Sequence, residues 1–281
     1  MKDYLVTTIA LLLLIFGASL RIDIEDLLYP PAIQQVIAPL LIITLVFRVF
    51  TNVQVPKLWF WAGMPLGITS SAICLLSLLH NVESADGFEQ EIAHSLISLG
   101  YGLAASMLGR TFIGHKSSAA ADSKEDVPTA LRLFVVGAVL ACFLISTEPL
   151  IGLSGLLDPS AALLVFSVLL LGTYKSSAGA RAEGVMSGFV FGSLACVFVG
   201  LVGYLFSGLD PRGLGPATAT GLLGIIYSGL GVVGAIIFFQ TKELSQSSVE
   251  RKNWHLMEIY ALWVLMCFAP MSLRESFLFV N

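Results

Sequence analysis

Long apolar segments alternate with short polar ones along almost the whole chain. Each apolar segment holds about 17 to 24 residues, which is the length an α-helix needs to cross the hydrocarbon core of a bilayer. The pattern predicts eight transmembrane helices, over residues 4–20, 31–50, 58–80, 91–113, 130–152, 160–176, 184–207 and 216–240. A ninth segment, residues 254–273, is also apolar but carries Glu258. It either spans the membrane or lies in the interface with its aromatic residues at headgroup level.

Composition identifies the solvent of this chain. Of its 281 residues, 56% are hydrophobic and 12% are charged, and the mean hydropathy is +0.87. A soluble domain carries about 25% charged residues, so lipid must surround much of this surface. In lipid the backbone must satisfy its own hydrogen bonds, and segments of this length do so as helices. The sequence therefore predicts an all-α polytopic integral membrane protein. The four cysteines lie inside apolar segments without metal-ligand or disulfide spacing, so we interpret them as packing residues.

The distribution of positive charge predicts the orientation. With the N-terminus in the cytoplasm, only three of the 15 Lys and Arg residues face outside, namely Arg21, Arg212 and, with a spanning ninth helix, Arg274. The other 12 face inside, in agreement with the positive-inside rule. The predicted outer loops are acidic instead, around residues 23–26 and 83–91.

One polar linker, residues 114–129, divides the chain nearly in half and is expected to be flexible and cytoplasmic. Residues 27–32 read LLYPPA and residues 156–161 read LLDPSA. Each motif opens a predicted helix, where proline is favourable. We therefore predict a repeat, with four helices in residues 1–113, four in residues 130–241, and the ninth segment within residues 242–281. Because four is even, the two copies point the same way across the membrane.

Small residues form a matching stripe on the fourth helix of each half, at spacings of 3, 4, 3 and 4. The two stripes consist of Ser95, Ser98, Gly102, Ala105 and Gly109, and of Gly221, Gly224, Ser228, Gly231 and Ala235. Such a stripe lets another helix approach closely. We interpret both stripes as helix-packing seams rather than as pore walls.

Two short motifs in the first half carry a family resemblance. Residues 64–68 of the third predicted helix read MPLGI, and the fourth helix contains Leu96, Ser98, Tyr101 and Gly102. These residues resemble the third and fourth helices of the MotA/TolQ/ExbB proton-channel family, and LLYPPA looks like that family's Asp-Pro motif. The resemblance covers residues 5–113 and, more weakly, residues 132–240.

The resemblance implies a subunit of a proton or sodium channel, or of an energy-transducing complex, in the bacterial inner membrane. Family members assemble as rings around a partner that supplies single-span helices with an essential acidic residue. This chain has no acid at the midplane, so a conducting complex would need that partner. The likeness therefore implies an oligomer in the lipid bilayer with a single-span partner, and no nucleic acid.

The chain also departs from the family. The large cytoplasmic domain of MotA is missing, because the matching inner loops, around residues 51–57 and 177–183, are short. The second half lacks the proline of the third helix. At the positions that match the family's fourth-helix threonines, the first half keeps the hydroxyl of Ser98, whereas the second half has Gly224 and Ile225. A tandem chain contributes two units at a time and cannot tile a five-membered ring. We therefore expect any ion path to be better preserved in the first half, with the second half as a packing copy.

The candidate ion-path residues follow from these motifs. They are Pro65, Thr69, Ser70, Ser98, Tyr101 and Gly102. A proline kink frees backbone carbonyls that, with hydroxyls, could coordinate a cation or water. The alternative is that Ser and Thr bond back to their own helix. Weaker candidates are Glu148, His80 and His94, for an ion relay or pH gating, which equally suit helix ends at headgroup level.

No nucleotide-binding loop, metal-ligand cluster or nucleophile–base arrangement is visible in the sequence, so we expect no enzyme activity, no metal and no cofactor. The leading hypothesis is a MotA/ExbB-like ion-translocating subunit. The alternatives are a non-conducting membrane scaffold or assembly subunit, and a small-solute permease with parallel repeats.

Overall fold

A computed structural model of the chain describes residues 28–50, 55–81, 85–113, 127–174, 176, 180–206, 211–244 and 246–278. All elements in these ranges are helices. They are α3 (Pro30–Ala32), the π-helical turn η1 (Ile33–Ile37), α4 (Ala38–Phe50), α5 (Val55–Asn81), α6 (Ala85–Ile113), α7 (Thr129–Gly155), α8 (Pro159–Tyr174), α9 (Arg181–Phe206), α10 (Pro211–Glu243) and α11 (Gln246–Leu278).

Six of the described helical segments are long and apolar enough to cross a membrane. They are Pro30–Phe50, Val55–Leu79, Gln90–Thr111, Thr129–Gly155, Arg181–Phe206 and Gly215–Phe239, with Pro159–Tyr174 as a shorter apolar helix. All seven coincide with predicted transmembrane segments, so the prediction of a multi-pass helical membrane protein is confirmed. The predicted helix over residues 4–20 and most of the linker lie outside the described residues. The ninth segment falls within α11, which is not among the six.

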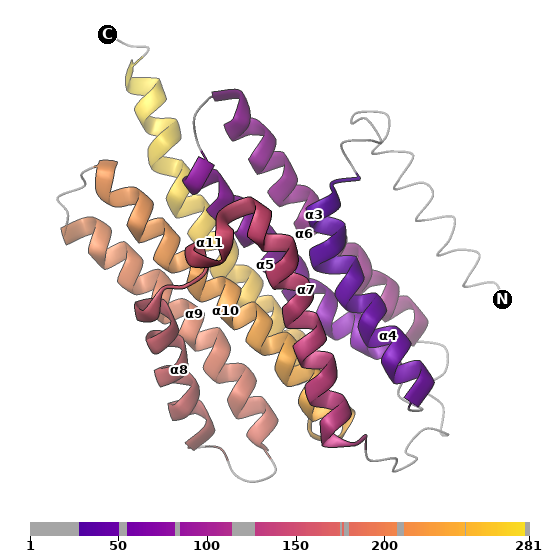
Figure 1. Cartoon of the computed structure of the whole chain (residues 1–281). Coiled ribbons are helices and arrows are strands. Elements are labelled where there is room, and N and C mark those ends of the chain that lie inside the picture. The colour runs from indigo at the N-terminus through magenta and orange to yellow at the C-terminus, as the bar shows by residue number, and fades with distance from the viewer. Residues whose placement is uncertain are drawn as a thin grey trace.

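Helix α5 lies at the centre of the bundle. Every residue from 60 to 78 is buried, so this helix meets protein on all sides, as a helix without charged residues in this stretch can. Helix α6 runs along one side of α5 and α10 along another, while α9 and then α8 continue the bundle beyond α10 (Figure 1). The α5–α6 and α9–α10 hairpins are the two most extensive helix pairings.

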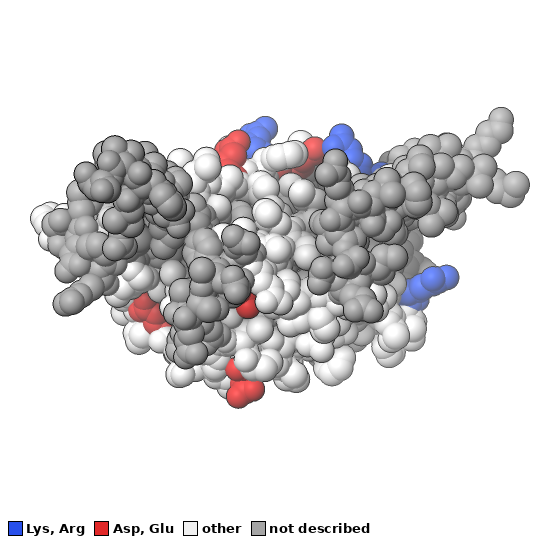
Figure 2. Space-filling view, turned by 90° about the horizontal axis from the view of Figure 1, so that it is seen from above, with Lys and Arg blue, Asp and Glu red and all other residues white. Residues whose placement is uncertain are grey.

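The periphery of the bundle is apolar. Large side chains such as Phe134 on α7, Phe166 on α8 and Phe198 on α9 are exposed, which suits contact with lipid. Seen from one end, the charged side chains that the structure describes are few and scattered (Figure 2). The apolar surface therefore agrees with contact with a bilayer.

Glycines allow a close approach of α5 and α6. A Cβ built on Gly102 would lie 2.5 Å from the Cα of Gly67 and 2.6 Å from the carbonyl oxygen of Gly63, so no larger residue fits there. On α9 and α10, Gly224 lies directly against the side chain of Cys196. Close contact of this kind is how membrane helices associate without a hydrophobic driving force.

Both proline motifs begin helices, as predicted. Helix α3 begins at Pro30 and α8 begins at Pro159. Asp158 caps α8, because its Oδ1 accepts hydrogen bonds from the backbone N–H groups of Ser160 (2.8 Å) and Ala161 (3.3 Å). The repeat as a whole stays a prediction.

Candidate functional site

Polar side chains gather around the middle of α5 although most of the surrounding helix surface is apolar. We call eight of them the polar core: Gln35, Ser70, Thr147, Ser71, Ser95, Tyr260, Cys74 and Ser98. They come from η1, α5, α6, α7 and α11. The structure thus joins segments that lie far apart in the sequence.

Gln35 lies at the centre of one part of the polar core. It is fully buried and lies in η1, and π-helical turns of this kind are frequent at functional sites. The hydroxyl of Ser70 donates to Gln35 Oε1 at 2.7 Å, and Gln35 Nε2 donates to Thr147 Oγ1 at 3.4 Å. Thr147 in turn donates to the carbonyl of Phe143 at 2.6 Å. These bonds link η1, α5 and α7 close to the midpoint of α5.

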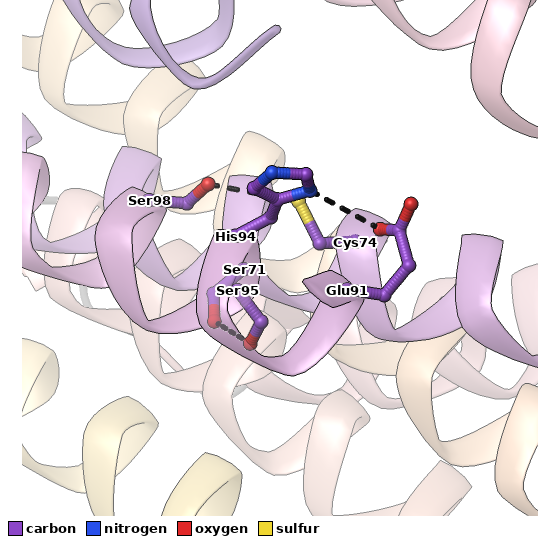
Figure 3. A network of polar contacts seen from close by, with 6 residues as sticks. All are labelled: Ser71, Cys74, Glu91, His94, Ser95 and Ser98. Carbon is purple, nitrogen blue, oxygen red and sulfur yellow. Dashed lines mark hydrogen bonds and ion pairs between the residues drawn. The ribbon is translucent and has the colours of Figure 1, made fainter. Parts of the chain in front are cut away.

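Tyr260 of α11 joins the second part. Ser71 and Ser95 share a hydrogen bond of 2.7 Å (Figure 3). The Tyr260 hydroxyl bonds to Ser71 and lies 3.4 Å from Ser95 Oγ. Three hydroxyl groups from α5, α6 and α11 therefore meet at one point. Each hydroxyl can both donate and accept a hydrogen bond.

Further polar contacts lie towards the far end of α5. Cys74 Sγ and Ser98 Oγ lie 3.6 Å apart. One turn earlier on α6, the ring of His94 stacks on that of Tyr29, with centroids 3.7 Å apart. His94 Nδ1 lies 3.9 Å from Glu91 Oε2 (Figure 3). Burial, with smaller contributions from Cys74 and Glu91, raises the pKa of the Tyr29 phenol, which therefore stays protonated.

Pro65 leaves the carbonyl of Trp61 without its usual helical donor, because proline has no N–H. Asn253 of α11 replaces that donor, since its Nδ2 lies 2.8 Å from the Trp61 oxygen. Thr69 donates to the carbonyl of Pro65 at 2.8 Å and so bonds within its own helix. The freed carbonyl is thus occupied by a side chain of this chain rather than open to an ion.

A second proline shows the same arrangement. At the end of η1 the N–H of Ala38 bonds to the carbonyl of Ile33, five residues earlier. The next pair at this offset is Pro39 and Gln34, but proline has no N–H, so the Gln34 carbonyl lacks that donor. Cys142 Sγ of α7 lies 3.2 Å from the Gln34 oxygen. At both prolines, a side chain from another helix supplies the missing donor.

The structure separates the predicted ion-path residues into groups. Ser70 and Ser98 belong to the polar core, whereas Pro65, Thr69 and Gly102 do not. Tyr101 is half-buried on α6. Among the weaker candidates, His94 lies at the end of the polar contacts, Glu148 is exposed on α7, and the side chain of His80 lies outside the described part.

The predicted seam residues face neighbouring helices. On α6, Gly102 meets Gly67, Gly109 meets Phe60, and Ser95, Ser98 and Ala105 are buried. On α10, Gly224 meets Cys196, Gly231 meets Phe189 and Gly221 meets Trp263 of α11, while Ser228 is buried. The described residues contain no group of three or more His, Cys, Asp or Glu side chains placed to hold a metal ion.

Sequence reasoning missed Gln35, Thr147, Asn253 and Tyr260. One signal for Gln35 was available, because a polar residue inside a spanning segment is usually functional. For α11 the signal was the spacing of its buried residues: Val249, Asn253, Leu256, Tyr260 and Trp263. This spacing of 4, 3, 4 and 3 marks one face of a helix packed against others.

The arrangement suits proton relay better than cation binding. Its hydroxyl, thiol and amide groups are neutral, and most already hydrogen-bond to one another. A chain of groups that donate and accept can pass a proton by reorienting those bonds.

No family model matches the chain, and neither a curated protein nor a solved structure shows significant similarity to it.

Proposed function

We propose that this chain is a proton-conducting subunit of the bacterial inner membrane, similar to MotA and ExbB, with its N-terminus in the cytoplasm. The observation that carries the proposal is a series of separate polar groups along one half of α5. From its midpoint to its far end these are Gln35 with Ser70 and Thr147, Ser71 with Ser95 and Tyr260, Cys74 with Ser98, and His94 with Glu91. Polar groups inside a membrane are costly and therefore usually functional. The neutral hydroxyl network favours protons over sodium ions.

The proposed path lies inside one chain. Ser70, Ser71 and Ser98 are enclosed by the chain's own helices, so a partner's carboxylate would have to displace a helix to reach them. In our proposal the proton therefore uses this chain's own groups. A single-span partner would pack on the lipid-facing helices and regulate or anchor the complex.

We further propose that α11 is a ninth transmembrane helix. Its support is the pair of contacts that Asn253 and Tyr260 make with α5. Asn253 contacts Trp61, and Tyr260 contacts Ser71 further along both helices, so α11 runs parallel to α5. A helix lying flat in the interface would not reach both depths.

Proton flux into liposomes tests the proposal. The purified protein is reconstituted with an internal pH-sensitive dye, with and without any co-purified single-span partner, and an inward proton gradient is applied. Flux above that of protein-free vesicles is expected, with a lower flux for Tyr260→Phe. Equal dye responses in vesicles with and without protein, with the partner also present, would reject conduction.

A second candidate is a non-conducting scaffold. Its support is the tight contact of Gly67 with Gly102, together with Gly224 and Ile225 on α10, which carry no hydroxyl where the first half has Ser98. A scaffold would use the polar core only to fix which helices pair. If the protein is a scaffold, Tyr260→Phe should change its stability and assembly, and neither the native protein nor the variant should conduct protons.

A further inference from the structure

Three deeply buried polar atoms in the Val55 half of the bundle have no hydrogen-bond partner among the described residues. They are Trp61 Nε1 on α5, Ser106 Oγ on α6 and Asn253 Oδ1 on α11. Their residues are 0%, 8% and 5% exposed, respectively. None belongs to the polar core, which lies on the other side of the α5 midpoint.

The three residues lie at one level of α5. A Cβ built on Gly63 would lie 2.8 Å from Ser106 Oγ, and Asn253 Nδ2 bonds to the carbonyl of Trp61 at 2.8 Å. Trp61 and Gly63 are two residues apart. Ser106 and Asn253 therefore approach the same turn of α5 from two neighbouring helices.

Two bridges between α6 and α11 bound this level. Towards the middle of α5, Ser95 and Tyr260 approach within 3.4 Å. Towards the other end, Arg110 Nη1 lies 3.4 Å from Glu250 Oε1, and this ion pair is exposed to solvent. Ser106 lies between Ser95 and Arg110 on α6, and Asn253 lies between Tyr260 and Glu250 on α11.

Unpaired polar atoms at such depth need a partner. A polar atom buried without a hydrogen bond loses its hydration and gains nothing in return, and the membrane interior supplies no bulk water. The indole N–H can only donate, the amide oxygen can only accept, and the hydroxyl can do both. That combination matches a water molecule, which typically makes about three hydrogen bonds when buried.

We infer that Trp61, Ser106 and Asn253 bind ordered water between α5, α6 and α11, reached from the end of the bundle that carries Arg110 and Glu250. The inference extends the proposed function, because such water would continue the proton route from Tyr260 to the cytoplasmic side. The water site itself does not require conduction.

Cysteine labelling tests the water site directly. All four native cysteines are first replaced by serine, and single cysteines are then introduced as Ser106→Cys, Ala105→Cys and Met107→Cys in protein held in nanodiscs. Ala105 is buried in the α5–α6 seam and Met107 is exposed on the lipid-facing side, so they are matched neighbours. A small charged methanethiosulfonate should modify Ser106→Cys at least about tenfold faster than either control, because the reactive thiolate forms in water. Equal rates at all three positions would overturn the inference.

A measurement on the native sequence covers the case in which a variant does not fold. Brief X-ray radiolysis produces hydroxyl radicals from internal water, and mass spectrometry then locates oxidised side chains. Trp61 and Met186 are both 0% exposed. Oxidation of Trp61 several-fold above Met186 is expected, and equal protection of both would contradict the site. If Ser106→Cys is labelled but the protein shows no proton flux, the water site stands and the proposed function is rejected. If the protein shows proton flux but Ser106→Cys is not labelled, the proposed function stands and the water site is rejected.

Discussion

At the scale of single residues, two prolines each leave a backbone carbonyl that a side chain of a neighbouring helix contacts. The carbonyl that Pro65 frees is bonded by Asn253, and the carbonyl that Pro39 frees lies beside Cys142. A proline kink therefore does not act alone here, because each one creates an acceptor that only another helix can satisfy. This links the identity of a residue on α5 to the docking of α11.

The Pro65–Asn253 relation predicts a non-additive effect. Asn253→Ala should destabilise the protein by about 1–3 kcal/mol, because it leaves the Trp61 carbonyl unpaired. Pro65→Ala restores an N–H that can bond to that carbonyl, so Asn253→Ala should cost clearly less in that background. Unfolding of all four proteins in mixed micelles measures the coupling. Equal costs in both backgrounds would show that Asn253 does not act through the Trp61 carbonyl.

Asp158 predicts a dependence on pH. Partial burial raises the pKa of its carboxyl, but hydrogen bonds from Ser160 and Ala161 outweigh that and lower it below the ordinary value of 3.8. The cap therefore stabilises the fold above that pH and loses its contribution as the pH falls through the lowered pKa.

Substitution separates the cap from the charge. Asp158→Ala should cost about 1 kcal/mol at neutral pH, and Asp158→Asn should cost less because asparagine also caps helices. Melting temperature in detergent at pH 7 and pH 3 measures both effects. A loss for Asp158→Ala that is as large at pH 3 as at pH 7 would contradict the assignment to the ionised carboxylate.

At the scale of elements, the α5–α6 pair depends on backbone contact. Gly102→Ala should destabilise the protein by about 1–3 kcal/mol through overpacking, because the added methyl would meet the Cα of Gly67. Gly100→Ala is the matched control, since nothing lies within 4 Å of a Cβ at that position. It should be neutral or stabilising, as alanine favours helix. Melting curves in detergent distinguish the two, and similar losses for both would reject the close contact.

Helix α11 carries a prediction about topology. As a ninth span beside α5, it places the C-terminus on the side opposite the N-terminus. Alkaline phosphatase fused after residue 281 should be active in the periplasm, whereas green fluorescent protein at that position should stay dark. After residue 244, a phosphatase fusion should be inactive and a green fluorescent protein fusion should fluoresce. A fluorescent fusion after residue 281 would place α11 in the interface.

Much of the fold was predictable because lipid imposes a simple pattern. The predicted segments 31–50, 58–80 and 130–152 match Pro30–Phe50, α5 and α7 within about three residues, since length and hydropathy alone define such helices. Pro30 and Pro159 were found for the same reason: a proline after a polar loop suits a first turn.

The site was less predictable, for physical reasons. Ser70 and Ser98 were identified from their helices, but their partners lie on other elements. Gln35 reaches Ser70 across 35 positions and Tyr260 reaches Ser71 across 189. A single sequence contains no signal for such pairings. Glu258 left both a spanning and an interfacial placement open for the ninth segment. The sequence did not show that Asn253 and Tyr260 are buried against polar groups of α5.

At the scale of the whole molecule, the polar core surrounds one central helix whose neighbours all belong to the same chain. This favours a path within the monomer over one at the axis of a ring. The second half contributes α9 and α10 as a tightly packed pair of helices. The helices therefore have different parts in our proposal: η1, α5, α6 and α11, with Thr147 of α7, form the path, and α8, α9 and α10 support it.

The most direct test compares proton flux in liposomes for three proteins. Ser71→Ala removes the hydroxyl that joins Ser95 and Tyr260, whereas Ser193→Ala removes a buried hydroxyl that bonds only within α9. Our account predicts flux for the native protein, about a tenfold loss for Ser71→Ala, as expected for one lost hydrogen bond of about 1.4 kcal/mol, and native flux for Ser193→Ala. Equal flux in all three proteins would contradict it.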